Sequence, residues 1–299
     1  MDFSYYILFW VCIFGLCLGS FYNVVIIRSL KDESIVFPPS KCPKCGNKLF
    51  WWHNIPILSY LLLRGKCYFC KENISIQYPI IEFITMLLFA ASYLRFGLTY
   101  KTLFVVIWLS CLLIMTMTDL KEKVVDCNIA IFMGITGAIY GFVADGLKGV
   151  LFSLIGLIIG VVIIEIIARF GYLFTKSRAM GEADTYVAGA LGAIFGYNVL
   201  PVLLYGFIAS MLFIIPIFLY IRYKADDKKT CIFSILFIIS VLLFKTVYET
   251  IPILICVILT GTLLAISTIK GIKTEQSKMY LPYVPALSVG AICGMILFL

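Results

Sequence analysis

Carboxylates and histidine are scarce in this sequence. Its 299 residues include 16 Asp and Glu and a single His, and charged residues make up 13% of the chain. In soluble domains, about a quarter of the residues are charged. With 62% hydrophobic residues and a mean hydropathy of +1.05, the chain has more apolar surface than one soluble core can bury. The composition excludes an ordinary soluble protein and predicts an all-α polytopic membrane protein with the bilayer as its solvent.

Long polar stretches are also few, and they divide the chain. We expect a first transmembrane helix in residues 1–27, a cytoplasmic four-cysteine domain in 28–79 and a transmembrane bundle in 80–299. About eight to ten helices are expected to cross the membrane. The candidate segments are 4–27, 80–96, 102–119, 128–144, 149–168, 184–199, 200–221, 231–245, 251–269 and 281–299.

The positions of the cations test this division. The net charge of +8 could suggest a nucleic-acid partner, but cationic cytoplasmic loops explain it more simply, and we expect no nucleic acid. If the N-terminus lies outside, all Lys and Arg residues except four fall on the cytoplasmic side, as the positive-inside rule requires. This topology places residues 28–79, Asp119 and Asp184 on the cytoplasmic side. The four exceptions are Arg95, Lys101, Lys148 and Lys245.

Most of the eleven cysteines lie in or beside apolar runs, where a thiol behaves as a small hydrophobe. Two Cys-x-x-Cys pairs instead have the spacing of metal ligands, and together they form a tetrahedral sulfur shell that suits zinc or iron. We expect a structural zinc in a small ribbon-like loop; the alternative is two free or redox-active dithiols. The only histidine, His53, is expected to lie with Trp51 and Trp52 at the membrane interface rather than to bind the metal. The predicted ligands are Cys42, Cys45, Cys67 and Cys70.

Four carboxylates fall within or at the ends of apolar segments: Glu82, Asp119, Glu165 and Asp184. A carboxylate buried there costs on the order of 3 kcal/mol on insertion scales, so such residues usually face the bundle interior and mark a function. Structural explanations suffice for two of them, since Glu82 can cap its own helix or meet the positive end of that helix and Glu165 can pair with Arg169 one turn later. Taken alone, Asp119 can be an ordinary charge at a helix end.

Asp184 lies among small residues. Gly181 and Ala183 precede it, and mostly glycine and alanine occupy 188–193. Small residues let transmembrane helices approach closely, so we expect a neighbouring helix to bring Asp119 within reach of the same water molecule. Two such carboxylates share one proton. The ionised member takes a proton from water while the neutral member donates to a scissile carbonyl, which is peptide hydrolysis without a metal or a covalent intermediate.

A set of ordered motifs runs through nearly the whole chain, and it resembles the type IV prepilin peptidases, bacterial members of the GxGD class of membrane aspartyl proteases. Besides the two Cys-x-x-Cys pairs, the motifs are Gly19-Ser20-Phe21-Tyr22-Asn23, Asn54-Ile55-Pro56-Ile57-Leu58-Ser59-Tyr60, Leu63-Arg64-Gly65-Lys66-Cys67, Tyr78-Pro79-Ile80-Ile81-Glu82, Thr118-Asp119, Gly181-Glu182-Ala183-Asp184 and Tyr283-Val284-Pro285-Ala286-Leu287.

The resemblance implies that Asp119 and Asp184 are the catalytic pair and that the four cysteines bind zinc. It implies a multi-pass enzyme of the bacterial inner (cytoplasmic) membrane, in contact with membrane lipid and with its active site facing the cytoplasm. The family cuts the short basic leader from prepilins or pseudopilins. Many members then methylate the new N-terminus with S-adenosylmethionine. No glycine-rich nucleotide-binding loop of the usual kind occurs in the sequence, so methyl transfer rests on the resemblance alone.

The chain departs from the family pattern at several positions. Ala183 replaces the second glycine of the motif, Tyr186 replaces a common lysine, and Asp126 stands at a proline position. The segment 222–280 is longer than usual, which suggests two extra spans.

Two other functions remain open. A proton-coupled transporter could use Asp119, Glu165 and Asp184 as a relay, although no internal repeat is evident and both aspartates lie toward one membrane face. A structural or assembly subunit could dock a partner through its zinc loop. Leader cleavage of a co-expressed prepilin separates these functions from a peptidase.

Overall fold

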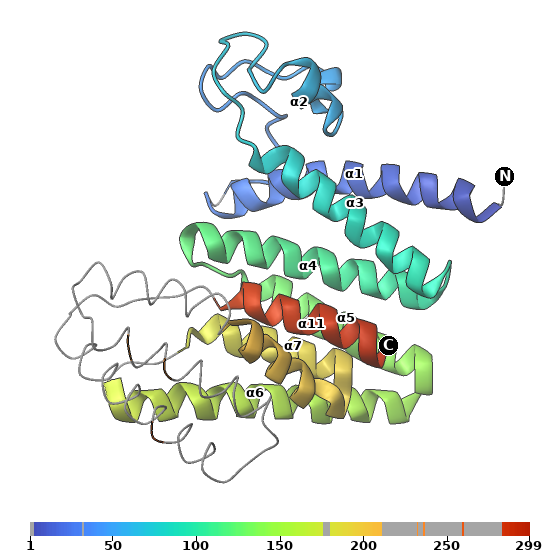
Figure 1. Cartoon of the computed structure of the whole chain (residues 1–299), viewed down its shortest axis with the longest axis vertical. Helices are drawn as coiled ribbons and strands as arrows, with labels where there is room; N and C mark the ends of the chain where they lie inside the picture. The colour runs from blue at the N-terminus through green and yellow to red at the C-terminus, as the bar shows by residue number, and fades with distance from the viewer. Residues whose placement is uncertain are drawn as a thin grey trace.

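The computed structural model is a helical bundle (Figure 1). It describes residues 3–31, 33–175, 180–210 and 283–299, together with the single positions 232, 236 and 259. Within these ranges there is no β-strand, only two isolated bridges in the four-cysteine loop. The helices are α1 (Phe3–Ser29), η1 (Trp51–Asn54), α2 (Leu58–Leu62), α3 (Gln77–Phe96), α4 (Tyr100–Glu122), α5 (Cys127–Asp145), α6 (Leu147–Thr175), α7 (Glu182–Phe195), η2 (Gly196–Asn198) and α11 (Val284–Phe298).

Long apolar runs account for these helices, because a segment in lipid must satisfy its backbone hydrogen bonds internally. Among the described residues, six helical stretches are long and apolar enough to cross a membrane, and α11 is a shorter apolar helix. The prediction of an all-α polytopic membrane protein is therefore confirmed. Most helices begin and end within a few residues of the expected segments. The expected segments 231–245 and 251–269, and the end of 200–221, lie outside the described residues.

The helices are arranged in layers (Figure 1). α1 and α3 pack against each other on one side, and the four-cysteine loop that joins them lies beside them. α4 runs through the middle, and α5, α6, α7 and α11 form the other side. Because α4 contacts α1, α3, α5 and α11, much of it is enclosed by other helices, and Asp119 near its carboxyl end is buried.

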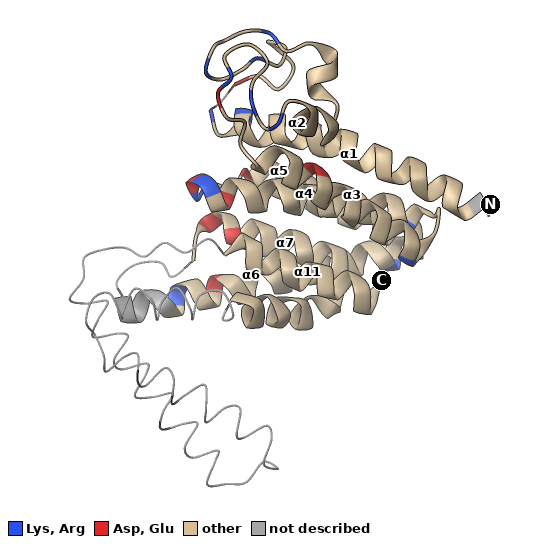
Figure 2. Cartoon of the chain, turned by 45° about the horizontal axis from the view of Figure 1, so that its top comes forward, with Lys and Arg blue, Asp and Glu red and all other residues tan. Residues whose placement is uncertain are grey.

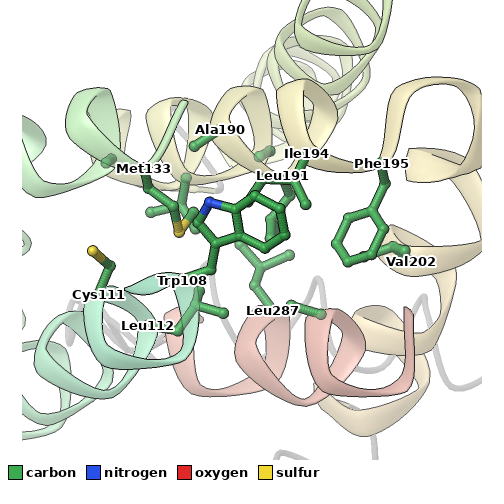
Figure 3. Packing of buried hydrophobic residues seen from close by; sticks show 14 of the residues in the cluster. Trp108, Cys111, Leu112, Met133, Ala190, Leu191, Ile194, Phe195, Val202 and Leu287 are labelled. Carbon is green, nitrogen blue, oxygen red and sulfur yellow. The ribbon is translucent and has the colours of Figure 1, made fainter. Parts of the chain in front are cut away.

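Trp108 of α4 is the largest fully buried side chain of the core. Figure 3 shows its ring among residues of three other helices, including Met133 of α5, Leu191 of α7 and Leu287 of α11. The indole Nε1 donates a hydrogen bond to Thr136 Oγ1 of α5 at 3.0 Å, which satisfies the one polar atom of the ring. This cluster fixes α4 against the helices that carry the other predicted site residues.

The chain reverses direction at Gly196. Residues 182–210 are apolar enough to be counted as one span, but Gly196 adopts φ +56° and the short η2 turn follows it. The helix over 199–210 then runs antiparallel to α11, because Val202 lies against Gly294 whereas Gly206 lies against Ala286. The structure therefore supports the expected division of this region into two spans.

The small residues of α7 face α5 and α6. A Cβ atom added at Gly192 would clash with the carbonyl oxygen of Gly156, and one added at Gly160 would clash with that of Ala188. α7 packs mainly on α6 and α5, and α11 contacts both α7 and α4. The expectation that this face receives the helix that carries Asp119 is therefore wrong. Apolar helices have no strong hydrophobic preference among partners in lipid, so close backbone packing selects α6.

Charged residues gather in the four-cysteine loop and at the end of the bundle where α4 ends and α7 begins (Figure 2). Among the residues that the structure describes, the opposite end carries fewer charges. There Arg95 donates to the carbonyl of Ile296 at 3.0 Å, and Lys101 donates to the carbonyl of Leu299 at 3.1 Å. The carboxyl end of α11 therefore lies far along the bundle from Asp119 and Asp184.

Candidate functional site

The four cysteines predicted to bind a metal meet at one point. The sulfur atoms of Cys42, Cys45, Cys67 and Cys70 all lie within 4.8 Å of one another. In each pair the N–H of the first cysteine donates to the carbonyl five residues later, at 2.9 Å in the first pair and 2.8 Å in the second. Each turn contains one left-handed residue, Gly46 (φ +71°) in the first and Lys71 (φ +60°) in the second. The spacing in the sequence therefore produces two matching turns that aim four sulfur atoms at one position.

Backbone amides, burial and neighbouring thiols shift the pKa values of Cys67 and Cys70 in opposite directions. The N–H groups of Cys70 and Phe69 donate to the Cys67 sulfur. The effect of these hydrogen bonds outweighs that of burial and lowers the pKa of the Cys67 thiol to about 7. The Glu72 N–H donates to the Cys70 sulfur, but burial and the neighbouring thiols raise the pKa of Cys70 to about 11. A thiolate available near neutral pH is what a metal requires of its ligand. The cluster can therefore hold a structural metal that ties together a loop without a core of its own.

His53 lies outside the four-cysteine cluster, and it is a core residue of the loop rather than a residue of the membrane interface. Its ring is 7% exposed and lies among Phe50, Trp52, Tyr68 and Phe69, with ring centroids 3.8 Å apart for the closest pair, His53 and Trp52. The Phe50 N–H donates to Nδ1 at 3.2 Å, and burial lowers the pKa of the imidazole. A neutral ring with Nδ1 as acceptor carries its proton on Nε2.

Three of the remaining carboxylates have structural roles. Glu82 Oε2 accepts the N–H of Ile57 at 2.7 Å, so it ties the loop to α3, and the expectation that it caps its own helix is wrong. Asp126, whose role the sequence left open, caps the first turn of α5. The predicted ion pair between Glu165 and Arg169 forms, with Arg169 Nε 2.9 Å from Glu165 Oε1.

Asp119 is buried near the end of α4, with 4% of its surface exposed. Its Oδ2 atom accepts the N–H of Val284 at 3.0 Å, and the N–H of Tyr283 also donates to this carboxylate. Lys123, the left-handed residue that ends α4, lies within electrostatic range. The carboxylate therefore points into the bundle, at the amino end of α11, where the helix dipole is positive.

Asp184 is buried in the first turn of α7, with 7% of its surface exposed. Its Oδ2 atom accepts the N–H of Gly181 at 3.0 Å. The carboxylate also lies within electrostatic range of the Tyr283 phenol. Both predicted aspartates thus face the protein interior at the same end of the bundle.

Tyr283 is the residue that connects the two carboxylates. Its backbone N–H donates to Asp119, and its side chain lies within electrostatic range of Asp184. Tyr283 belongs to the last of the sequence motifs, but it was not among the predicted site residues. The one local signal in the sequence is Pro285, because a proline in the first turn marks the start of a helix and so predicts that Tyr283 lies at the amino end of α11. Nothing local in the sequence indicates that this helix start lies against a carboxylate of α4.

Comparisons with known proteins agree with this architecture. Two family models match the chain: the Bacterial Peptidase A24 N-terminal domain over residues 13–96 and the Type IV leader peptidase family over residues 104–219. The chain is also similar to three proteins named prepilin leader peptidase/N-methyltransferase. Identity is 36% over 188 residues for that of Myxococcus xanthus, covering 63% of this chain and 56% of that protein. Identity to the protein of Neisseria gonorrhoeae is 33% over 224 residues, which covers 67% of this chain and 77% of that protein. Identity to the protein of Xanthomonas campestris is 33% over 218 residues, which covers 64% of this chain and 74% of that protein.

No solved structure gives a significant match to the chain. The family matches and the bundle of membrane-spanning helices define a membrane peptidase. The chain belongs to the type IV leader peptidase family, as its motifs predicted.

Proposed function

We propose that Asp119 and Asp184 are the catalytic pair with which this prepilin peptidase removes the leader peptide of a type IV prepilin or pseudopilin. The observation that supports the pair most directly is the burial of both carboxylates at one end of the bundle, on either side of residue 283. Carboxylates are scarce in this chain and costly to bury in a membrane, so two of them buried near each other mark a site.

In each aspartate, the Oδ2 atom already accepts a backbone hydrogen bond. An amide N–H can only donate, so Asp119 Oδ2 must accept from Val284 and Asp184 Oδ2 must accept from Gly181. The proton that the pair shares therefore does not lie in either of these two hydrogen bonds. The ionised aspartate removes a proton from the attacking water, and the neutral aspartate donates to the carbonyl of the scissile peptide bond.

Aspartate-to-asparagine variants test this proposal. Asp119→Asn and Asp184→Asn keep the shape of each side chain but remove its acid–base function, so each should reduce cleavage of a co-expressed prepilin by about 10²–10⁴-fold at unchanged protein level. Glu165→Gln is the matched control, because its pairing with the exposed Arg169 lies outside the proposed site; cleavage should stay at the wild-type rate. Full cleavage by either asparagine variant would rule out the pair, and loss of substrate uptake without any cleavage would point to a transporter.

The same assay addresses methyl transfer. The relatives named above are leader peptidases and N-methyltransferases, and we propose that S-adenosylmethionine is the methyl donor if this chain also modifies the new N-terminus. Mass spectrometry of the mature pilin, with and without S-adenosylmethionine, detects the added methyl group.

We further propose that the four-cysteine cluster holds zinc and that the loop and both aspartates face the cytoplasm. Four sulfur donors within 4.8 Å of one another favour zinc over harder metals. Lys121 and Lys123 follow Asp119 at the end of α4, and Arg169 lies on the part of α6 that continues past Gly160 toward the start of α7, in agreement with the positive-inside rule. We also propose the division into 1–27, 28–79 and 80–299, which the loop between α1 and α3 supports, and a location in a bacterial inner membrane, which the similarity to prepilin leader peptidases supports.

A further inference from the structure

Tyr283 carries a buried hydroxyl group without a hydrogen-bond partner. The residue is 8% exposed, and no atom of the described chain forms a hydrogen bond with the phenolic oxygen. Buried tyrosine hydroxyls usually find a partner, since an unpaired one costs about 1–3 kcal/mol. A native group of this kind needs an explanation, and service to a ligand or substrate is one.

The position of this hydroxyl is fixed from three sides. The N–H groups of Tyr283 and Val284 hold the Asp119 carboxylate. The Tyr283 ring packs against Phe207, with ring centroids 5.5 Å apart. The Asp184 carboxylate lies within electrostatic range of the phenol. The unpaired donor therefore belongs to the residue at the amino end of α11 whose backbone holds Asp119 and whose phenol lies within electrostatic range of Asp184.

We propose that the Tyr283 hydroxyl donates a hydrogen bond to the scissile carbonyl oxygen of the substrate, a role that rests on the proposed function. Water adds to the carbonyl carbon, the π bond of the carbonyl breaks, and its electron pair moves to the oxygen. One aspartate takes the proton that the water loses, and the other transfers its own proton to the carbonyl oxygen. Tyr283 keeps its proton throughout and stabilises the charge that develops on this oxygen, supported by the positive end of α11.

Tyr283→Phe removes only the hydroxyl oxygen and tests this role in the purified full chain acting on a prepilin. We expect kcat to fall about 10²-fold, the loss typical of one oxyanion donor, with KM and the pH profile unchanged. The thermal unfolding midpoint should stay the same or rise, because the oxygen removed has no partner in the folded enzyme. Tyr140→Phe is the matched control: it removes another buried phenol of the same hydrophobic cluster and should leave kcat unchanged.

Three results would overturn the role. The first is a kcat for Tyr283→Phe within about twofold of wild type, far from the loss expected of an oxyanion donor. The second is a shifted pH optimum with full kcat at the new optimum, which would mean that the phenol acts through the aspartates. The third is a lowered unfolding midpoint, which would show that the hydroxyl stabilises the fold. If the two asparagine variants remain active, the catalytic pair fails; if they are inactive and Tyr283→Phe is fully active, only the role of Tyr283 fails.

Discussion

Cys67 and Cys70 belong to the same turn, yet their thiols have very different pKa values. Two amide donors at Cys67 lower its pKa to about 7, whereas burial and three neighbouring thiols raise that of Cys70 to about 11. In the metal-free protein, Cys67 is therefore the thiol that ionises first as the pH rises. The order of ionisation follows from the amide donors at Cys67 and from burial and the neighbouring thiols at Cys70.

This difference predicts the order of alkylation in metal-free protein. The thiolate is the reactive form, so iodoacetamide should modify Cys67 with a midpoint near its pKa of about 7 and Cys70 only at strongly alkaline pH. Peptide mapping by mass spectrometry after removal of the metal with a chelator gives both midpoints. Zinc-loaded protein should be protected at all four cysteines. Faster modification of Cys70 than of Cys67 at neutral pH would contradict the predicted order.

At the scale of elements, the contact between α6 and α7 sets the position of Asp184. Gly192 and Gly156 bring the two backbones so close that a Cβ at either position would clash with the other helix. Asp184 lies on α7 about two turns before Gly192, so a displacement of α7 moves the carboxylate relative to Tyr283 and Asp119. The small residues thus serve the site indirectly, by fixing α7 on α6.

Gly192→Val tests this contact. Overpacking of this kind costs about 1–3 kcal/mol, so we expect a lower thermal unfolding midpoint and strongly reduced prepilin cleavage. Gly134→Ala is the control on the neighbouring face, since its added Cβ would meet Ala190 at 3.6 Å, an ordinary contact. It should be neutral or stabilise the helix by up to about 1 kcal/mol. Equal tolerance of both substitutions would contradict tight packing at Gly192.

At the scale of the whole molecule, the charge distribution and the fold favour one topology. Lys121 and Lys123 follow Asp119 at one end of the bundle, and the C-terminus lies at the opposite end, where Lys101 donates to the carbonyl of Leu299. If the aspartates face the cytoplasm, as the positive-inside rule requires, then the C-terminus must lie on the other side.

Reporter fusions measure this topology. Alkaline phosphatase fused after Leu299 should be active, and green fluorescent protein at the same position should be dark, because each reporter matures on only one side of the membrane. An epitope inserted after Lys123, next to the end of α4, should be accessible to antibody only after the cells are permeabilised. A fluorescent C-terminal fusion would reverse the proposed orientation.

Much of this molecule could be predicted from local features of the sequence. Lipid forces each spanning segment to satisfy its own backbone, so apolar length alone placed most helices within a few residues. The four-cysteine site was equally local, because each Cys-x-x-Cys turn forms within a few residues of chain. Glu82 could not be predicted in the same way, since its partner, the Ile57 N–H, lies in a loop whose path depends on the whole domain.

The sequence by itself determined the membrane class, the helices, the cysteine cluster and the two candidate aspartates. Only the tertiary structure decided that α7 packs on α6 and α5 and that the start of α11 joins Asp119 to Asp184 through Tyr283. The physical reason is that helices apolar on all sides carry no periodic signal of which face meets which neighbour. Their partners are selected by backbone fit and by a few buried polar groups, and these act between residues far apart in the chain.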